Sequence, residues 1–209
     1  MWKKEKRYHA LRMDEDGARG SVSRRQLLGY AAVGAAGAAA ASLAGGQGAT
    51  ASPAYLRGMG DFRRLDLFSR RTGERLNIVF YADGEYIPEA LDEINFIARD
   101  WRRNEIRSID VKAVDFAAAL HNRLETSESL HLVSGYRSLE TNNLLRRRGR
   151  GVAKNSYHTK AMALDVTLES RTVSQMYRAA MVLKAGGVGR YSRDHFVHVD
   201  SGPVRSWGR

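Results

Sequence analysis

Residues able to do metal or acid–base chemistry gather in three short segments of the sequence. They are Ser134–Ser138 (Ser-Gly-Tyr-Arg-Ser), Ser156–Asp165 and His195–Asp200 (His-Phe-Val-His-Val-Asp). Each segment lies at an end or on a face of an apolar run typical of a β-strand. Imidazoles and carboxylates in proximity bind divalent metals or exchange protons near neutral pH. These three segments are therefore the candidates for a metal or catalytic centre.

Strand alternation indicates how three of these side chains meet. Asp165 follows Ala161 and Ala163 on one face of its strand, and a carboxylate there needs a partner if it is buried. His158 precedes Asp165 by seven residues, in the loop that leads into the strand. In the last strand His198 and Asp200 share one face. If the two strands are neighbours, His158, Asp165 and His198 converge.

Two imidazoles and one carboxylate are a suitable ligand set for zinc, whose catalytic sites leave a fourth position to water. Bound Zn²⁺ lowers the pKa of that water from about 16 to about 7 and polarises a carbonyl group. The helical H-E-x-x-H motif is absent from this sequence. Spacing alone leaves a metal-free alternative open, in which a buried aspartate and histidine form only a hydrogen bond.

The elements that position these residues follow from hydrophobic periodicity. Strands are expected near residues 64–69, 76–81, 130–134, 161–167, 188–191 and 196–200. Helices are expected from Pro88, over 111–124, after Ser138 and from the capping box at Thr172. Helices come first and an antiparallel-looking set of strands follows. The predicted fold is α+β, with a small antiparallel sheet that bears the zinc site and packs against helices.

The first 51 residues resemble an export signal rather than part of the domain. Arg24-Arg25 precedes an apolar run from Leu27 to Ala44, and Ala49-Thr50-Ala51 supplies a small-residue cleavage site. The paired arginines resemble a bacterial twin-arginine signal. An uncleaved anchor and a buried alanine-rich helix are the alternatives. We expect a signal peptide at 1–51, a linker at 52–60 and a catalytic domain at 61–209, with the protein in the periplasm or cell envelope and in contact with membrane only during export.

Composition excludes several classes of site. The 209 residues include no cysteine, which rules out disulfide scaffolds, iron–sulfur clusters and thiol nucleophiles. The net charge of +11 suits an anionic partner or simple solubility. Arg146–Arg148 raises nucleic acid as a partner, but the export signal and the lack of interleaved aromatic and basic residues argue against it.

Three motifs together carry a family resemblance. They are Ser-Gly-Tyr-Arg-Ser, then Ser-x-His-x-x-x-Ala-x-x-x-Asp, then Phe-Val-His-Val-Asp-Ser-Gly-Pro-Val-Arg-Ser-Trp. In this order they resemble the D-alanyl-D-alanine metallopeptidase superfamily, and within it the exported zinc murein endopeptidases. The resemblance covers roughly residues 60–209. It implies His158, Asp165 and His198 as zinc ligands.

The resemblance also implies an activity. Arg137 matches an arginine near the scissile carbonyl, where a guanidinium stabilises the developing oxyanion. The function expected is zinc-dependent hydrolysis of amide bonds in peptidoglycan cross-links. The alternatives are a non-catalytic peptidoglycan-binding domain of the same fold and a D,D-carboxypeptidase. The bond that is cut and the oligomeric state stay open.

The general base is where this sequence departs from the family pattern. Relatives commonly carry Asp or Glu three residues before the last ligand, and here His195 stands there, after Asp194. A regular strand would turn His195 away from His198. Asp200 is an equal candidate and Asp194 a weaker one. Asp200 has a second possible role, since it could orient a ligand imidazole.

Overall fold

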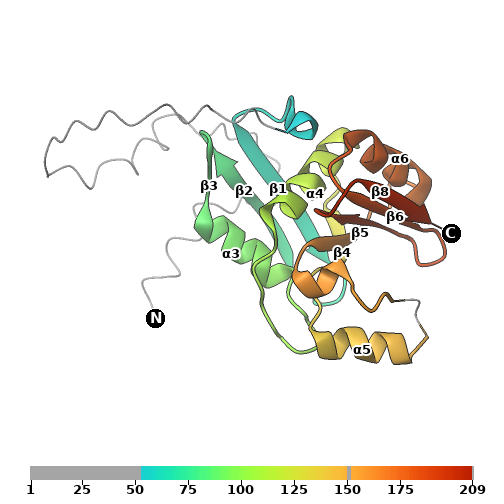
Figure 1. The fold of residues 1–209 in the computed structure, drawn as a ribbon. Helices are drawn as coiled ribbons and strands as arrows, with labels where there is room; N and C mark the ends of the chain where they lie inside the picture. The colour runs from blue at the N-terminus through green and yellow to red at the C-terminus, as the bar shows by residue number, and fades with distance from the viewer. Residues whose placement is uncertain (1–52, 150–151, 209) are drawn as a thin grey trace, which may run out of the picture. The chain divides into compact units, whose positions relative to one another are not determined.

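The computed structural model describes residues 53–149 and 152–208 (Figure 1). The predicted signal at 1–51 lies outside these residues. Within the expected linker, the 3₁₀ helix η2 (Ala54–Leu56) packs on the domain, because Leu56 is buried and the Tyr55 ring lies 6.4 Å from that of Phe116. No helix in the described part of the chain is long and apolar enough to cross a bilayer.

The described strands form one sheet of eight, in the order β3-β2-β1-β4-β5-β7-β6-β8. Their bounds are β1 (Phe62–Ser69), β2 (Arg75–Ala82), β3 (Glu85–Tyr86), β4 (Leu130–Ser134), β5 (Ala163–Thr167), β6 (Gly187–Tyr191), β7 (Phe196–Asp200) and β8 (Arg205–Gly208). The pairs β1–β4 and β6–β8 are parallel, and the other pairs are antiparallel. The sheet is thus larger than expected and mixed, whereas the α+β class is confirmed.

Four α-helices accompany the sheet in the described residues. They are α3 (Pro88–Ile97), α4 (Val111–Arg123), α5 (Leu139–Arg147) and α6 (Val173–Leu183). Their starts follow local sequence: Pro88 occupies the first turn of α3, Asp110 and Ser138 cap α4 and α5, and Thr172 with Gln175 completes the expected capping box of α6.

The alternation of side chains along β5 and β7 places hydrophobic residues on one face of the sheet and candidate site residues on the other. Leu164 and Val166 of β5 pair with Val199 and Val197 of β7, and all four are fully buried in the hydrophobic core. The residues between them therefore take the opposite face of the sheet. That face holds Asp165 and His198, which lie directly opposite one another.

Candidate metal centre

A single row of residues across five strands carries the site. Asp165 of β5 pairs with Ser134 of β4 on one side and with His198 of β7 on the other. His198 pairs with Gly189 of β6, which in turn pairs with Trp207 of β8. Directly opposed residues of a sheet present their side chains on the same face. The predicted juxtaposition of Asp165 and His198 is therefore present in the structure.

His158 reaches the row from a turn. It lies in the 3₁₀ helix η3 (Tyr157–Lys160), where the Ser156 hydroxyl accepts from the His158 backbone N–H at 3.3 Å. Ala161 follows with φ of 55°, a left-handed conformation that favours glycine. This residue turns the chain into β5, so that His158 lies beside Asp165.

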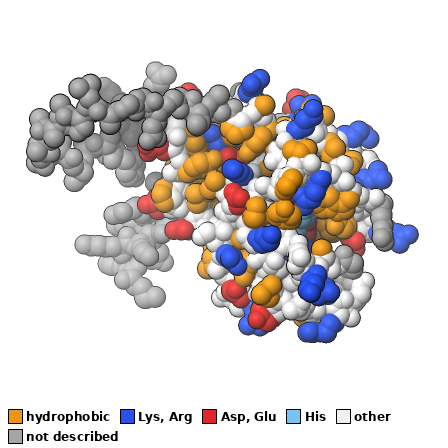
Figure 2. All heavy atoms as spheres, viewed as in Figure 1, with side chains coloured by type: hydrophobic (Ala, Val, Ile, Leu, Met, Phe, Trp, Pro, Cys, Tyr) orange, Lys and Arg blue, Asp and Glu red, His pale blue; other side chains and the backbone are white. Residues whose placement is uncertain are grey.

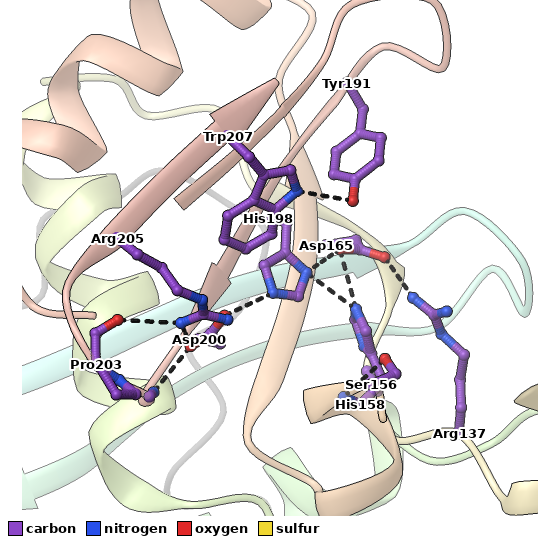
Figure 3. A network of polar contacts seen from close by, with 12 residues as sticks. Arg137, Ser156, His158, Asp165, Tyr191, His198, Asp200, Pro203, Arg205 and Trp207 are labelled. Atoms are coloured by element: carbon purple, nitrogen blue, oxygen red, sulfur yellow. Dashed lines mark hydrogen bonds and ion pairs between the residues drawn. The ribbon is translucent and has the colours of Figure 1, made fainter. Parts of the chain in front are cut away.

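Three acceptor atoms meet at this point: His158 Nε2, Asp165 Oδ1 and His198 Nδ1 (Figure 3). Asp165 Oδ1 lies 3.1 Å from His158 Nε2 and 2.8 Å from His198 Nδ1, and the two nitrogens are 3.1 Å apart. A tetrahedral ion with bonds of about 2.05 Å separates its ligand atoms by about 3.3 Å. The three atoms are therefore spaced nearly as a first-row metal requires.

Hydrogen bonds on the far side of each ring determine its tautomer. His158 Nδ1 lies 2.7 Å from the Gly135 carbonyl oxygen, and His198 Nε2 lies 2.9 Å from Asp200 Oδ2. These oxygens accept only, so each neutral ring holds its hydrogen there. The lone pairs of His158 Nε2 and His198 Nδ1 then face the Asp165 carboxylate with no hydrogen between them. Such a set of acceptors fits a bound cation.

The surroundings of the three side chains shift their pKa values, and these shifts decide which of them are charged. Burial lowers the pKa of His158 to about 4, so its ring is neutral at pH 7. Burial works to raise the pKa of Asp165, but His158, His198 and Arg137 hold it well below its usual range. For His198, burial lowers the pKa, and hydrogen bonds to Asp165 and Asp200 outweigh this and raise it. Below that pKa, a proton on His198 Nδ1 would compete with a metal for the same position.

Arg137 lies beside the donor atoms, as the family resemblance implies. Its Nη2 donates to Asp165 Oδ2 at 2.8 Å and its Nε to Ser134 Oγ at 2.9 Å. Its Nη1 makes no hydrogen bond with any residue of 53–149 or 152–208. The guanidinium is thus anchored on one edge, and its Nη1 edge is available to a substrate.

Asp200 supports His198 from behind. The side chain has no exposed surface, and Arg205 donates to both of its oxygens, at 2.7 and 2.9 Å. Burial works to raise the pKa of Asp200, but hydrogen bonds from His198 and Arg205 hold it far below the usual value. A carboxylate so stabilised is a weak proton acceptor. The geometry favours the orienting role that the sequence left open for Asp200.

Comparison with known proteins agrees with this geometry. The family model described as peptidoglycan L,D-endopeptidase MepK matches residues 58–207, which include all three candidate ligands and Arg137. The chain belongs to the MepK family. A family of this description is a peptidase family, so the three-donor cluster is a candidate active site as well as a candidate metal site.

Individual MepK relatives match over the same region. Peptidoglycan L,D-endopeptidase MepK of Escherichia coli strain K12 is 46% identical over 145 residues, which are 69% of this chain and 80% of the relative. The protein of the same name from Shigella flexneri gives the same values. The probable peptidoglycan L,D-endopeptidase MepK of Haemophilus influenzae is 36% identical over 146 residues, or 69% of this chain and 78% of the relative.

His195 and Asp194 lie apart from the donor atoms. Both are exposed in the turn between β6 and β7, and His195 has φ of 57°. His195 precedes the first residue of β7, and it is not one of the three residues whose ligand atoms meet. In this MepK-family chain the role of His195 as a proton acceptor stays a prediction.

Four residues of the site were not predicted from the sequence. The Gly135 carbonyl orients the His158 ring directly. Arg205 orients the His198 ring indirectly, through its contact with Asp200. Trp207 lies against the site, with its ring 5.2 Å from that of His198. The Tyr191 hydroxyl oxygen accepts a hydrogen bond from the Trp207 indole N–H, at 3.0 Å. The Gly-Tyr-Arg and Val-Arg-Ser-Trp motifs contained the signal for the first three, and Val-Gly-Arg-Tyr, which also resembles the family, contained the signal for Tyr191.

Proposed function

We propose that this chain is a zinc-dependent peptidoglycan endopeptidase that hydrolyses amide bonds in cell-wall cross-links. The observation that carries the proposal is the convergence of His158 Nε2, Asp165 Oδ1 and His198 Nδ1 beside a partly unengaged arginine. The names of the MepK relatives support the substrate and an L,D preference. Two nitrogen donors and one carboxylate favour zinc over magnesium or calcium, which prefer oxygen ligands.

Each residue has a distinct task in this mechanism. His158, Asp165 and His198 would hold the ion, which when bound supplies a Lewis acid and an acidified water. Gly135 and Asp200 keep the two rings in the tautomers that leave their lone pairs free. Arg137 would offer its Nη1 to an amide carbonyl oxygen that gains charge during the reaction. Its ion pair with Asp165 Oδ2 also keeps that carboxylate ionised and in place.

Digestion of purified sacculi tests the proposal. Full-length protein with Zn²⁺ should convert cross-linked muropeptides to uncross-linked products. Mass analysis should show that the two products of each cut together weigh one water more than the cross-linked muropeptide. Chelator should abolish the reaction and added Zn²⁺ should restore it. The masses also show whether 4→3 or 3→3 cross-links disappear. Asp165→Asn should be inactive, whereas Asp66→Asn, the same change at a half-buried position of β1, should leave activity unchanged.

The two alternatives give other results in the same assay. A D,D-carboxypeptidase would release terminal D-alanine and leave cross-links intact. A non-catalytic wall-binding domain would bind zinc and sacculi and release no new muropeptide. Either outcome would refute the endopeptidase proposal.

The surface charge fits a polymer rich in carboxylates. Lysine and arginine side chains are spread over the visible face among apolar and neutral ones (Figure 2). Nucleic-acid binding uses a continuous basic stripe instead. We infer peptidoglycan as the partner and expect no role for nucleic acid.

We also propose that the chain works in the periplasm or cell envelope. The support is the uncharged stretch at 26–51 after Arg24-Arg25, together with a substrate that lies outside the inner membrane. Arg24→Lys combined with Arg25→Lys should keep the protein in the cytoplasmic fraction. Export of this variant at the normal level would contradict a twin-arginine route.

A further inference from the structure

Gly189 leaves a gap in the row of site residues, and an indole fills it. A Cβ atom at position 189 would lie 2.7 Å from Trp207 Cε2, closer than real contacts allow. Trp207 therefore lies across Gly189 and against His198, with ring centroids 5.2 Å apart and planes at 53°. The indole forms a wall beside the donor atoms.

The same indole positions a phenol. Trp207 Nε1 donates to Tyr191 Oη at 3.0 Å. Tyr191 lies two residues after Gly189 in β6 and so shares its face, and its ring stacks on Phe196 at 4.5 Å. Two independent contacts thus fix the phenol. Figure 3 shows its oxygen directed toward His198 and Asp165.

The Tyr191 hydroxyl has a hydrogen to donate. An indole N–H only donates, so the phenol oxygen is the acceptor in this pair and its own hydrogen is unused. No residue of 53–149 or 152–208 accepts it. A phenol that accepts one hydrogen bond is a stronger donor in another. The group is therefore a preorganised donor beside the metal centre.

We propose that Tyr191 is a catalytic residue whose hydroxyl donates to the carbonyl oxygen of the amide that is cut, and that Trp207 positions it. Arg137 and Tyr191 lie on different sides of the donor atoms (Figure 3). Two donors can therefore hold the oxygen on which negative charge develops. This inference rests on the proposed endopeptidase function and adds a residue to it.

Tyr191→Phe tests the inference, because it removes one oxygen and keeps the ring. On a purified cross-linked muropeptide we expect kcat to fall about 100-fold and KM to change less than about 3-fold. Affinity for a phosphinate analogue of the scissile amide should weaken about 100-fold as well, because it mimics the charged intermediate. Zinc affinity and Tm should equal those of wild type. Tyr177→Phe, which removes a hydroxyl on α6, should change none of these values.

Coupling between the two aromatic residues tests the positioning role. Trp207→Phe should lower kcat, and the double variant should match Tyr191→Phe alone within about 2-fold, because the indole acts through the phenol. Additive losses would overturn that role.

The outcomes separate this inference from the function on which it rests. Wild-type protein that leaves the muropeptide uncut would refute the endopeptidase function. Active wild type with an equally active Tyr191→Phe variant would overturn the inference alone. A rise in KM at unchanged kcat would overturn it too, because the hydroxyl would then hold only bound substrate.

Discussion

At the scale of single residues, the site depends on which nitrogen of each imidazole carries hydrogen. His158 would coordinate through Nε2 because its Nδ1–H donates to the Gly135 carbonyl, and His198 would coordinate through Nδ1 because its Nε2–H donates to Asp200. The two rings are therefore opposite tautomers: His158 carries its hydrogen on Nδ1 and His198 carries its hydrogen on Nε2. We therefore expect Gly135 and Asp200, which would not contact the ion, to influence how tightly it binds.

Asp200→Asn should weaken zinc binding by about 10- to 100-fold. The amide loses the charge that both His198 and Arg205 use, so the His198 ring is held less firmly and is less basic. Competition with a chromophoric chelator measures the affinity. Asp194→Asn is the matched control, since Asp194 is exposed in the β6–β7 turn. Equal affinity of Asp200→Asn and wild type would contradict the orienting role.

Zinc affinity should fall as the pH falls. The pKa of His198 is raised, because its hydrogen bonds to Asp165 and Asp200 outweigh burial, so below that pKa a proton occupies Nδ1 and competes with the metal. The apparent affinity then drops about tenfold per pH unit. His158, with its pKa lowered to about 4, adds competition only in stronger acid. Affinities that are flat between pH 5 and 8 would be inconsistent with this account.

His195→Ala should leave zinc affinity within about 2-fold of wild type, because His195 lies in the exposed turn and not among the three donors. Chelator competition again gives the affinity, and His198→Ala provides the comparison that should lose it. If His195→Ala lowers kcat while zinc affinity stays unchanged, this result would support His195 as the proton acceptor. A large loss of zinc binding would contradict the placement of the turn.

At the scale of elements, a buried ion pair joins strand β1 to helix α4. Arg63 of β1 donates to Asp115 of α4 at 2.7 Å, with side chains only 6% and 2% exposed. Tyr86 of β3 donates to the other Asp115 oxygen at 2.6 Å. None of the three candidate ligands lies in β1 or β3. The network should therefore contribute to the free energy of unfolding without affecting metal binding or catalysis.

Asp115→Ala should lower the free energy of unfolding by about 3–5 kcal/mol, because it leaves the buried Arg63 charge unpaired. Urea denaturation measures this change. Asp66→Ala breaks the more exposed Arg64–Asp66 pair, whose atoms are 3.7 Å apart, and should cost less than about 1 kcal/mol. Zinc affinity of the folded Asp115→Ala protein should be unchanged. Equal costs for the two variants would contradict the assigned burial.

At the scale of the whole molecule, the metal would join segments that are far apart in sequence. His158 lies in η3, Asp165 in β5 and His198 in β7. An ion that binds only the folded arrangement stabilises it by mass action. Folding and metal binding should therefore be linked in this protein.

Zinc at about 100 times its Kd should stabilise the fold by about 2.7 kcal/mol, which raises Tm by roughly 5–10 °C for a domain of this size. Thermal unfolding with zinc and with chelator measures the shift. The Tm of Asp165→Asn should respond to neither. A wild-type Tm that is independent of zinc would show that the ion does not bind the folded chain at this site.

The sequence by itself determined much of the local structure and the candidate donors. Alternation in β5 and β7 placed Asp165 and His198 on the site face, and caps at Ser138 and Thr172 marked two helix starts. Such features depend on neighbours within a few residues, so a single segment specifies them. The three motifs then indicated the peptidase family.

Only the tertiary structure decided which strands are adjacent and what lies behind each ligand. The parallel pairing of β6 with β8 brings Trp207 over Gly189, and the loop after β4 brings the Gly135 carbonyl to His158. The same packing shows Asp200 bound by Arg205. These contacts join distant segments, and their geometry follows from packing the whole sheet and its helices, because local periodicity encodes the face of a residue but not its cross-strand neighbour.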